Sequence, residues 1–353
     1  MSPRADNVIE AMPYDPCVEP TPRVKMEDVA RTAGVSVATV SKVINGRYGV
    51  AQSTSTRVQE VIDRLGYETS LGARSLRSHR TNVLGILVAE FEPFSTELLK
   101  GVSAAVGATG YELLAYSGGG RGGDVGWERR YLTRLAGTLI DGAIIVTPTV
   151  VEANPGVPVV AVDPHTGPSG MPTVDSDNFA GAVLATEHLI ALGHRHIAFL
   201  GGRVDLESSR LREDGFRHAM IAAGFGVDES LVGIGGYRRE SSDEPARALL
   251  DRAHPPTALF AANDLSAIQV MTVARELGLT VPDDLSVIGF DNVPESALAT
   301  PALTTIAQPL QQMGAEALRL LVDLIDGTER ATNHLRLPTA LVVRASCAPP
   351  RRR

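Results

Sequence analysis

Residues 36–42 place small apolar, hydroxyl and basic side chains within one short stretch, SVATVSK. Side chains of these types can contact the exposed edges of DNA bases. Val37 and Ala38 can meet the methyl group of thymine, and Lys42, one helical turn later, can reach guanine O6 and N7 or a phosphate. The hydroxyls of the neighbouring Ser and Thr residues can bind phosphates. The chemistry predicted for this stretch is close contact with DNA.

Three short amphipathic helices are predicted to position these side chains. Apolar residues recur at helical spacing within residues 29–33, 40–44 and 58–65. Gly34 is expected to end the first helix, and Ser36 is a favourable N-cap for the second. Two short helices joined by a few residues including a glycine form the helix-turn-helix pattern. An ordinary helical hairpin stays open as an alternative for this stretch taken alone.

Charge is unevenly distributed along the chain. Residues 23–80 carry ten Lys/Arg and five Asp/Glu, whereas the whole chain has a net charge of −8. A small basic module on a large acidic body indicates a polyanionic partner for that module only, because net charge governs nonspecific association. Residues 1–22 are proline-rich without hydrophobic periodicity, and we expect a disordered extension there.

From residue 82 onward, apolar runs alternate with amphipathic stretches. This alternation is typical of parallel sheets covered by helices on both faces. Two such series predict an α/β fold with two doubly wound lobes, and ligands of such sheets bind beyond the carboxyl ends of the strands. The predicted strands are residues 83–88, 111–116, 143–146, 157–162, 196–200, 257–261 and 285–290, and the predicted helices are near 95–108, 126–136, 178–192, 208–223, 243–253 and 264–277.

Several classes of protein are disfavoured by the sequence. No apolar run approaches the roughly 18 residues of a membrane span, and no secretory signal pattern begins the chain, so we expect a cytoplasmic protein without a membrane partner. Cys17 and Cys347 lie near opposite ends without metal-ligand spacing. Neither G-x-S-x-G nor H-E-x-x-H occurs, so we predict no enzyme, no metal site and no cofactor.

Two other motifs have simpler interpretations. SGGGRGGD at 117–124 contains G-x-G-x-x-G, but Asp141 precedes the next strand instead of ending it, where a dinucleotide ribose would need an acid. We therefore expect a flexible loop at the edge of the cleft. GHRH at 193–196 resembles metal spacing, yet Gly193 is a natural helix C-cap before a strand.

The chain resembles the lactose-repressor (LacI/GalR) family of bacterial transcription regulators from about Val24 to Ser346. The resemblance rests on motifs that occur in the family's order: MEDVARTAGVSVATVSKVING (26–46), ARSLRS (73–78), HLIALGHRHIAFLGG (188–202), SSRLREDGF (208–216), TALFAANDLSA (257–267), VPDDLSVIGFDN (281–292) and PALTTIAQP (301–309). It implies a homodimer whose paired headpieces read a pseudo-palindromic operator, with a small molecule in the cleft controlling release.

For DNA contact the resemblance implies two groups of residues. The recognition helix would supply Ser36, Val37, Ala38, Thr39, Ser41, Lys42 and Asn45. The segment LGARSLRS at 71–78 corresponds to a hinge helix, in which Ala73 and Leu76 would pack against the partner hinge and wedge into the minor groove, while Arg74 and Arg77 hold phosphates. Thr69 and Ser70 stand where the family usually has Pro and Asn, and Ala51 where a capping Ser is common.

For the effector, the family resemblance points to polar residues at strand ends. Carboxylates, an amide and a guanidinium can pair with vicinal hydroxyls, which gives specificity for a sugar or oligosaccharide. Aromatic rings after the first strand can pack on a sugar ring. Trp127 is open to either a stacking role or a surface or interface role. The expected effector residues are Phe91, Glu92, Phe94, Asp163, Arg212, Asn263 and Asp291.

The predicted organisation is an extension (1–22), a helix-turn-helix headpiece (23–69), a hinge (70–80) and a two-lobed effector and dimerisation domain (81–353). Sugar-induced release from DNA is the predicted mechanism. Three alternatives stay open: a regulator whose purine-like or phosphoprotein co-repressor strengthens DNA binding, a solute-binding transport component with the same two lobes, and a sugar-modifying enzyme. The predicted headpiece disfavours the second, and the absence of a catalytic constellation disfavours the third.

Overall fold

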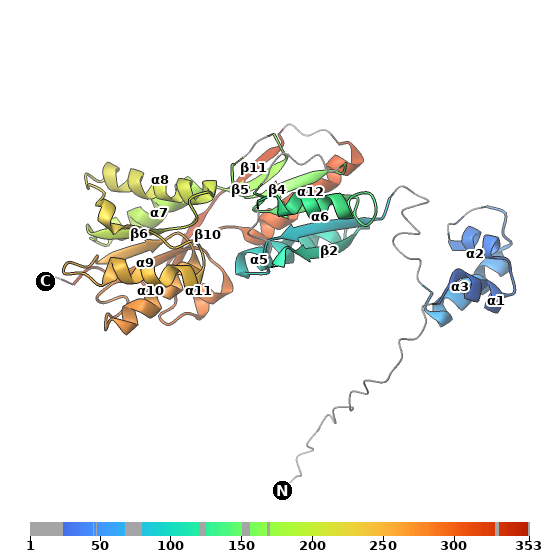
Figure 1. Ribbon diagram of the computed structural model, residues 1–353, viewed down its shortest axis with the longest axis horizontal. Helices are drawn as coiled ribbons and strands as arrows, with labels where there is room; N and C mark the ends of the chain where they lie inside the picture. The colour runs from blue at the N-terminus through green and yellow to red at the C-terminus, as the bar shows by residue number, and fades with distance from the viewer. Residues whose placement is uncertain are drawn as a thin grey trace, which may run out of the picture. The chain divides into compact units, whose positions relative to one another are not determined.

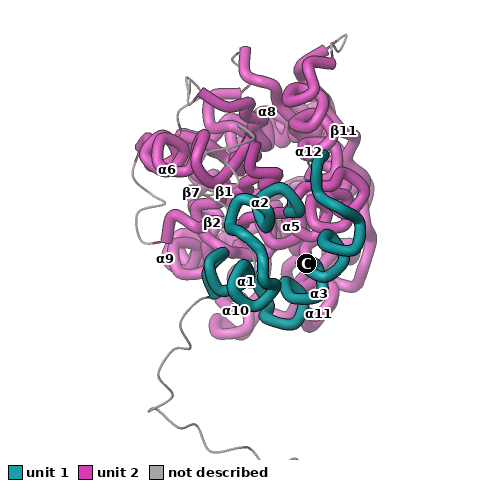
Figure 2. The backbone as a smooth tube through the Cα atoms, turned by 90° about the vertical axis from the view of Figure 1, so that its right-hand side faces the viewer, with its two compact units in different colours: residues 1–70 teal, residues 71–353 magenta. Residues whose placement is uncertain are grey.

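The structure is a computed structural model that describes residues 24–44, 46, 48–67, 80–119, 125–149, 156–167, 170–328 and 332–351. The chain divides into two compact units, residues 1–70 and 71–353 (Figure 2). The predicted boundaries around a hinge at 70–80 stay a prediction, because residues 68–79 lie outside the described part.

The first unit is a three-helix bundle. Its helices are α1 (Met26–Ala33), α2 (Val37–Ile44) and α3 (Gln52–Leu65). Val29, Val40 and Val58 are fully buried at the centre. Gly34 adopts a left-handed φ of 65° and ends α1, and Ser36 Oγ accepts a hydrogen bond from the Thr39 backbone N–H at 3.1 Å. The predicted helix-turn-helix geometry is therefore present, with Ser36 as the N-cap of α2.

The second unit contains two lobes, each built on a six-stranded sheet. The first sheet is entirely parallel, in the order β11-β5-β4-β3-β1-β2. Helices α5 and α12 pack on one of its faces and α6 on the other. Its elements are β1 (Val83–Val88), α5 (Pro93–Val106), β2 (Glu112–Ser117), α6 (Trp127–Leu135), β3 (Gly142–Val146), β4 (Val159–Val162), β5 (Thr173–Ser176), α12 (Leu310–Asp326) and β11 (His334–Leu337).

The second sheet has the order β12-β10-β9-β8-β6-β7 and is parallel except for β12. Helices α7 and α8 cover one face and α9 and α10 the other (Figure 1). Its elements are α7 (Asn178–Ala191), β6 (Ile197–Gly201), α8 (Glu207–Ala222), the 3-10 helix η2 (Glu229–Leu231), β7 (Val232–Ile234), α9 (Arg239–Leu250), β8 (Ala258–Ala261), α10 (Asp264–Glu276), β9 (Ser286–Asp291), α11 (Pro294–Leu298), β10 (Thr304–Ala307) and β12 (Ala340–Val342).

The two predicted doubly wound lobes are confirmed, but the predicted series is incomplete. It omits β5, β7, β10, β11, β12, α11 and α12. All five omitted strands have only three or four residues, too few for periodicity to separate them from loops. Helix α12 follows β10 of the second lobe in the sequence but packs on the sheet of the first lobe. A local sequence pattern cannot predict this placement.

The chain passes between the lobes after β5, after β10 and after β11. Each lobe is thus completed by segments distant in sequence. In the part of the chain that the structure describes, no helix is both long and apolar enough to cross a membrane.

Helices α5 and α12 approach closely because two glycines face the contact. A Cβ atom at Gly314 would overlap the carbonyl oxygen of Leu98, and one at Gly101 would overlap that of Gln311. We expect Gly314→Ala to lower the free energy of unfolding by about 1–3 kcal/mol, because the helices must separate to admit the methyl group. Urea unfolding followed by circular dichroism measures this loss.

The matched control is Gly107→Ala at the end of α5, where φ is −59° and no atom lies within 4 Å of the added Cβ. We expect its unfolding midpoint to equal or slightly exceed that of the wild type. Equal midpoints for the Gly314 and Gly107 variants would contradict a tight contact between α5 and α12.

Candidate functional site

The exposed side of α2 carries the predicted DNA-contact side chains. Ser36, Val37, Ala38 and Lys42 are exposed, and Thr39 and Ser41 are half-buried. Val40 points into the core and is fully buried. The helix therefore presents small side chains followed by one cation, a surface that a major groove can admit closely.

The other predicted DNA contacts fall outside the described residues. These are Asn45 and the hinge residues Ala73, Arg74, Leu76 and Arg77. Ala51 precedes α3 without any side-chain cap, in agreement with its loss of a capping hydroxyl.

A cavity of about 310 Å³ lies between the lobes of the second unit. Its walls are mainly loops that follow the carboxyl ends of strands in both sheets, together with residues of α8 and α10. The lining residues are Ala89, Glu90, Glu92, Phe94, Ser95, Thr147, Asp163, His165, Arg203, Leu206, Ser208, Arg212, Gly236, Tyr237, Arg238, Arg239, Glu240, Asn263, Leu265 and Asp291. Six of the seven predicted effector residues are among them.

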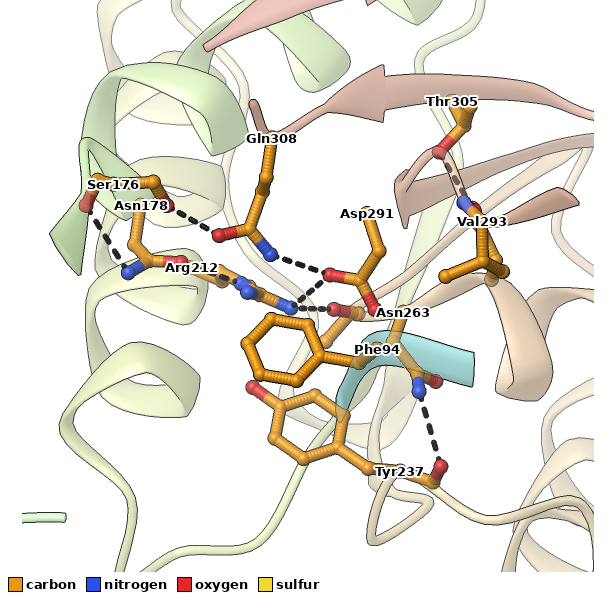
Figure 3. Close-up of polar contacts among 12 residues, drawn as sticks. Phe94, Ser176, Asn178, Arg212, Tyr237, Asn263, Asp291, Val293, Thr305 and Gln308 are labelled. Atoms are coloured by element: carbon orange, nitrogen blue, oxygen red, sulfur yellow. Dashed lines mark hydrogen bonds and ion pairs between the residues drawn. The ribbon is translucent and has the colours of Figure 1, made fainter. Parts of the chain in front are cut away.

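Arg212 occupies the inner wall and is only 3% exposed. Its Nε donates to Asn178 Oδ1 at 2.9 Å, and Nη1 donates to the Ala262 carbonyl oxygen at 2.5 Å. Nη1 also lies 3.4 Å from Asp291 Oδ1 (Figure 3). The guanidinium carbon lies 3.9 Å from the ring centroid of Phe290. This cation is held on one side by an aromatic face and at its edge by acceptors, so its direction is well defined.

Two carboxylates approach the cavity at the ends of β4 and β9. Burial raises the pKa of Asp163 to about 6, opposed by the nearby Arg212 cation. Burial likewise raises the pKa of Asp291 to about 7, opposed by Arg212 and by a hydrogen bond from Gln308. Both residues adopt positive φ, 48° and 109°. Such backbone strain, about 1–3 kcal/mol each, is typical of ligand sites.

Asn263 and Tyr237 form the wall beside Arg212. Asn263 Oδ1 accepts from the Ser266 N–H at the start of α10, and its Nδ2 donates to the Tyr237 carbonyl oxygen at 3.0 Å. The Tyr237 ring centroid lies 5.5 Å from the Arg212 guanidinium carbon. The Tyr237 hydroxyl is buried without a hydrogen-bond partner in the described part of the chain. An unpaired buried hydroxyl beside a cavity is a natural partner for a polar ligand.

The wall from the first lobe differs from its prediction in two respects. Glu92 lines the cavity, but its carboxylate is engaged as the N-cap of α5, accepting from the backbone N–H groups of Phe94 and Ser95 at 2.9 Å each. Phe91 does not line the cavity and is 54% exposed. The loop after β1 turns into α5 at Pro93, which directs Phe94 inward and leaves Phe91 outside.

Contacts between the lobes flank the cavity. Arg238 Nη2 pairs with Glu90 Oε1 at 2.7 Å, joining the loops after β7 and β1. His165 Nδ1 lies 3.1 Å from Asp205 Oδ2, and the Glu207 N–H donates to the His165 carbonyl oxygen. These polar contacts hold the lobes together around the cavity.

Sequence reasoning missed many lining residues. They include Glu90, Thr147, Arg203 and Tyr237. Each follows a parallel strand, so the rule that ligands bind beyond carboxyl ends could have found them. The hypothesis of Trp127 at the cleft or on the surface is wrong: its side chain is 1% exposed and packs in the core beneath α6, with Tyr131 at 5.7 Å between ring centroids.

The structure describes part of the glycine-rich motif at 117–124 and all of the GHRH motif at 193–196. Residues 120–124 of the glycine-rich stretch lie outside the described residues. His194 is 1% exposed, and its ring nitrogens contact Thr257, Ser286 and the Ala348 carbonyl oxygen at 2.9–3.1 Å. Among the residues that the structure describes, no group of three His, Cys, Asp or Glu residues is placed to hold a metal ion.

The raised carboxyl pKa values predict a specific pH dependence of stability. In the unfolded chain Asp163 and Asp291 regain ordinary values near 4, so between that pH and their folded pKa values the folded protein binds more protons. The free energy of unfolding should therefore fall as pH rises through about 6 and about 7.

Asp291→Asn should flatten this decline between about pH 4 and about pH 7, by on the order of a few kcal/mol. Chemical unfolding across that pH range provides the measurement. Asp284→Asn is the control, because hydrogen bonding to the Thr280 backbone N–H and the nearby Arg351 lower the pKa of that carboxyl, which keeps it ionised across this range. An unchanged slope in the Asp291 variant would show that its carboxyl is ionised throughout.

Known proteins resemble the chain over both units. The model of the lacI family of bacterial regulatory proteins matches residues 25–70, and that of the periplasmic binding protein-like domain matches residues 186–347. The HTH-type transcriptional regulator DegA of Bacillus subtilis (strain 168) is 36% identical over 332 residues, covering 91% of this chain and 97% of DegA.

Two solved structures resemble it along the same span. A structure of the transcriptional regulator CelR in complex with cellobiose has 35% identity and a TM-score of 0.67, covering 92% of this chain and 100% of that one. A structure of the lac repressor dimer bound to operator and the anti-inducer ONPF has 25% identity and a TM-score of 0.77, covering 92% and 99%.

These relatives are regulators that span both the headpiece and the two lobes, and none is named as an enzyme or a transport component. The small basic helical unit, the two parallel-sheet lobes and the cavity between them thus belong to one known design. The chain is a member of the LacI family of bacterial regulatory proteins, a DNA-binding transcriptional regulator.

Proposed function

We propose that this protein is a repressor that leaves a pseudo-palindromic operator when a neutral sugar or oligosaccharide occupies the cavity between its lobes. The observation that carries the proposal is the inner wall of the cavity, where the Arg212 guanidinium, two carboxylates and the Asn263 amide meet beside aromatic rings. Paired donors and acceptors fit vicinal hydroxyls, and rings fit the C–H face of a sugar.

The charges around the cavity support a neutral ligand. Arg212 lies against Asp291, Arg238 against Glu90, and Arg203 against Asp205. Since three of the four arginines that line the cavity have acidic partners, an anionic ligand at any of these three would have to displace a carboxylate. The relative whose structure holds cellobiose supports the same class of effector. A cavity of about 310 Å³ is near the lower end of the ligand-site range, which favours a small saccharide.

Operator binding is assigned to the exposed face of α2 in two copies of the chain. Ser36, Thr39 and Ser41 would bind phosphates, Val37 and Ala38 would meet thymine methyl groups, and Lys42 would reach guanine. A homodimer presents two such helices to two half-sites, which explains a pseudo-palindromic target. We assign the hinge residues Ala73, Arg74, Leu76 and Arg77 to the minor groove between the half-sites, and the protein to the cytoplasm, where the DNA is.

Lys42→Ala should weaken operator binding by about 1–3 kcal/mol if Lys42 reads a base. DNA selected by the wild-type protein from a random pool supplies the operator, and fluorescence anisotropy at fixed salt supplies the affinities. Binding to unrelated DNA should change much less. Lys25→Ala is the charge-matched control, an exposed cation that precedes α1. If Lys42→Ala lowered both affinities equally, Lys42 would be only a phosphate contact.

Thermal unfolding of the full-length protein with a panel of saccharides tests the effector class. A neutral saccharide at about 100 times its dissociation constant should add roughly 2.7 kcal/mol of stability. Cellobiose is the first probe, and the same saccharide should then lower operator affinity. The stabilisation should be lost in Arg212→Met and kept in Arg210→Met, an exposed arginine on the same helix.

Other outcomes of the panel would replace the proposal. Stabilisation by a purine or a phosphate, with stronger operator binding, would indicate a co-repressor. Failure of every saccharide, purine and phosphate would indicate that a protein partner controls the operator affinity.

A further inference from the structure

A closed ring of hydrogen bonds lies behind the cavity wall (Figure 3). Ser176 Oγ donates to Gln308 Oε1 at 2.5 Å, and Gln308 Nε2 donates to Asp291 Oδ1 at 2.6 Å. Asp291 meets Arg212, whose Nε donates to Asn178 Oδ1. Asn178 Nδ2 returns to the Ser176 carbonyl oxygen at 3.3 Å. All five residues are at most 6% exposed, so these bonds are shielded from water.

The ring spans two of the connections between the lobes. Ser176 ends β5 in the first lobe, and Asn178 begins α7 in the second. Gln308 lies between β10 of the second lobe and α12 of the first. Any change in the relative orientation of the lobes requires rotation about backbone dihedral angles at these connections. The hydrogen bond between Ser176 and Gln308 therefore joins two connecting segments, and both segments would move in such a change.

Only two members of the ring reach the cavity. Arg212 and Asp291 line it, whereas Ser176, Asn178 and Gln308 do not. The orientation of the Gln308 amide is determined by its neighbours, because the reverse orientation would place the amide oxygen against the Asp291 carboxylate. Gln308 and Arg212 both contact Asp291 Oδ1, and among the described residues no hydrogen bond is made to Oδ2, so Oδ2 is the oxygen that could accept from a ligand hydroxyl.

We propose that Gln308 is a positioning residue that orients Asp291 for the effector and transmits its occupancy to the connections between the lobes. The inference rests on the proposed function of the cavity as a saccharide site. A ligand hydroxyl that binds Asp291 Oδ2 would shift the carboxylate. The other oxygen of this carboxylate is linked to Ser176 by hydrogen bonds through Gln308. Effector binding in the cavity thereby favours one conformation of the two connecting segments over their alternative conformation.

The pH dependence of binding supplies a readout that a purely structural role would not change. The charged groups acting on Asp291 are Arg212, Glu92, Asp163 and Asp264. Burial raises the Asp291 pKa, and the Gln308 amide, by bonding to the ionised form, lowers it. Loss of the amide should move the Asp291 pKa upward, and with it the pH at which the carboxylate becomes an acceptor.

The test compares the full-length wild type with Gln308→Met, Ser176→Ala and the control Gln312→Met. Gln312 is an exposed glutamine on α12. Calorimetry with cellobiose from pH 5.5 to 8.5 gives the affinity and its pH midpoint. Operator affinity with and without saturating cellobiose gives the coupling, whichever its sign.

Gln308→Met should bind cellobiose about tenfold more weakly at pH 7, the loss expected for one hydrogen bond to a charged group. Its pH midpoint should move upward. Ser176→Ala, which breaks only the link to the first lobe, should lose more coupling than affinity. Gln312→Met should match the wild type throughout. If Gln308→Met also matched the wild type in affinity, midpoint and coupling, the proposal would be overturned.

A ligand-free measurement separates this inference from the proposed function. If the wild type does not bind cellobiose, cellobiose is not the effector, and the role of Gln308 is decided by chemical unfolding as a function of pH. Gln308→Met should extend the decline of stability to higher pH, and this extension should vanish in the Asp291→Asn background. An unchanged pH profile in Gln308→Met would overturn the positioning role.

Discussion

The buried guanidinium of Arg212 is the constraint around which the second unit is organised. A charge removed from water is tolerated only when its partners are close and correctly directed. Phe290 supplies a ring face, Ala262 a carbonyl oxygen and Asn178 an amide oxygen, while Asp291 supplies the opposite charge. These partners come from β9, the segment after β8, and α7. One cation therefore aligns the inner end of the second lobe.

This arrangement also explains why the cavity suits reversible binding. The inner wall is rigid, since Arg212 and Asp291 are held by buried bonds. The rim is softer, because the Arg238–Glu90 pair between the lobes is more than 40% exposed on both sides. Exposed pairs contribute little to stability, typically under 1 kcal/mol. Lobes joined by a rigid interior and a weak rim can open without unfolding, which population shifts by an effector require.

The DNA-binding unit differs from the second unit, because its functional surface is exposed and carries little charge. Its helix α2 carries one exposed cation, Lys42, and otherwise presents small side chains. Most affinity for DNA comes from phosphate contacts, so a recognition surface does not itself need a high charge. Small side chains bring the helix close to the base edges, where shape and hydrogen bonding decide which sequence is bound. The near-neutral surface of α2 is thus compatible with a basic module overall.

Local sequence determined much of this protein. Helical spacing, Gly34 and Ser36 were enough to predict the helix-turn-helix, and alternating apolar runs were enough for two parallel-sheet lobes, since both depend on contacts near in sequence. The alternation of strands and helices placed Asp163, Asn263 and Asp291 at strand ends, where parallel topology brings side chains together. Arg212 lies within α8 and was expected from the family resemblance alone.

Tertiary structure decided the rest. The exclusion of Phe91, the burial of Trp127 and the capping role of Glu92 depend on how one loop turns into α5 and how α6 packs on its sheet. The ring through Gln308 joins Ser176 to a residue 132 positions away in the sequence. No periodicity encodes such a contact, because it exists only once the chain has crossed between the lobes and returned.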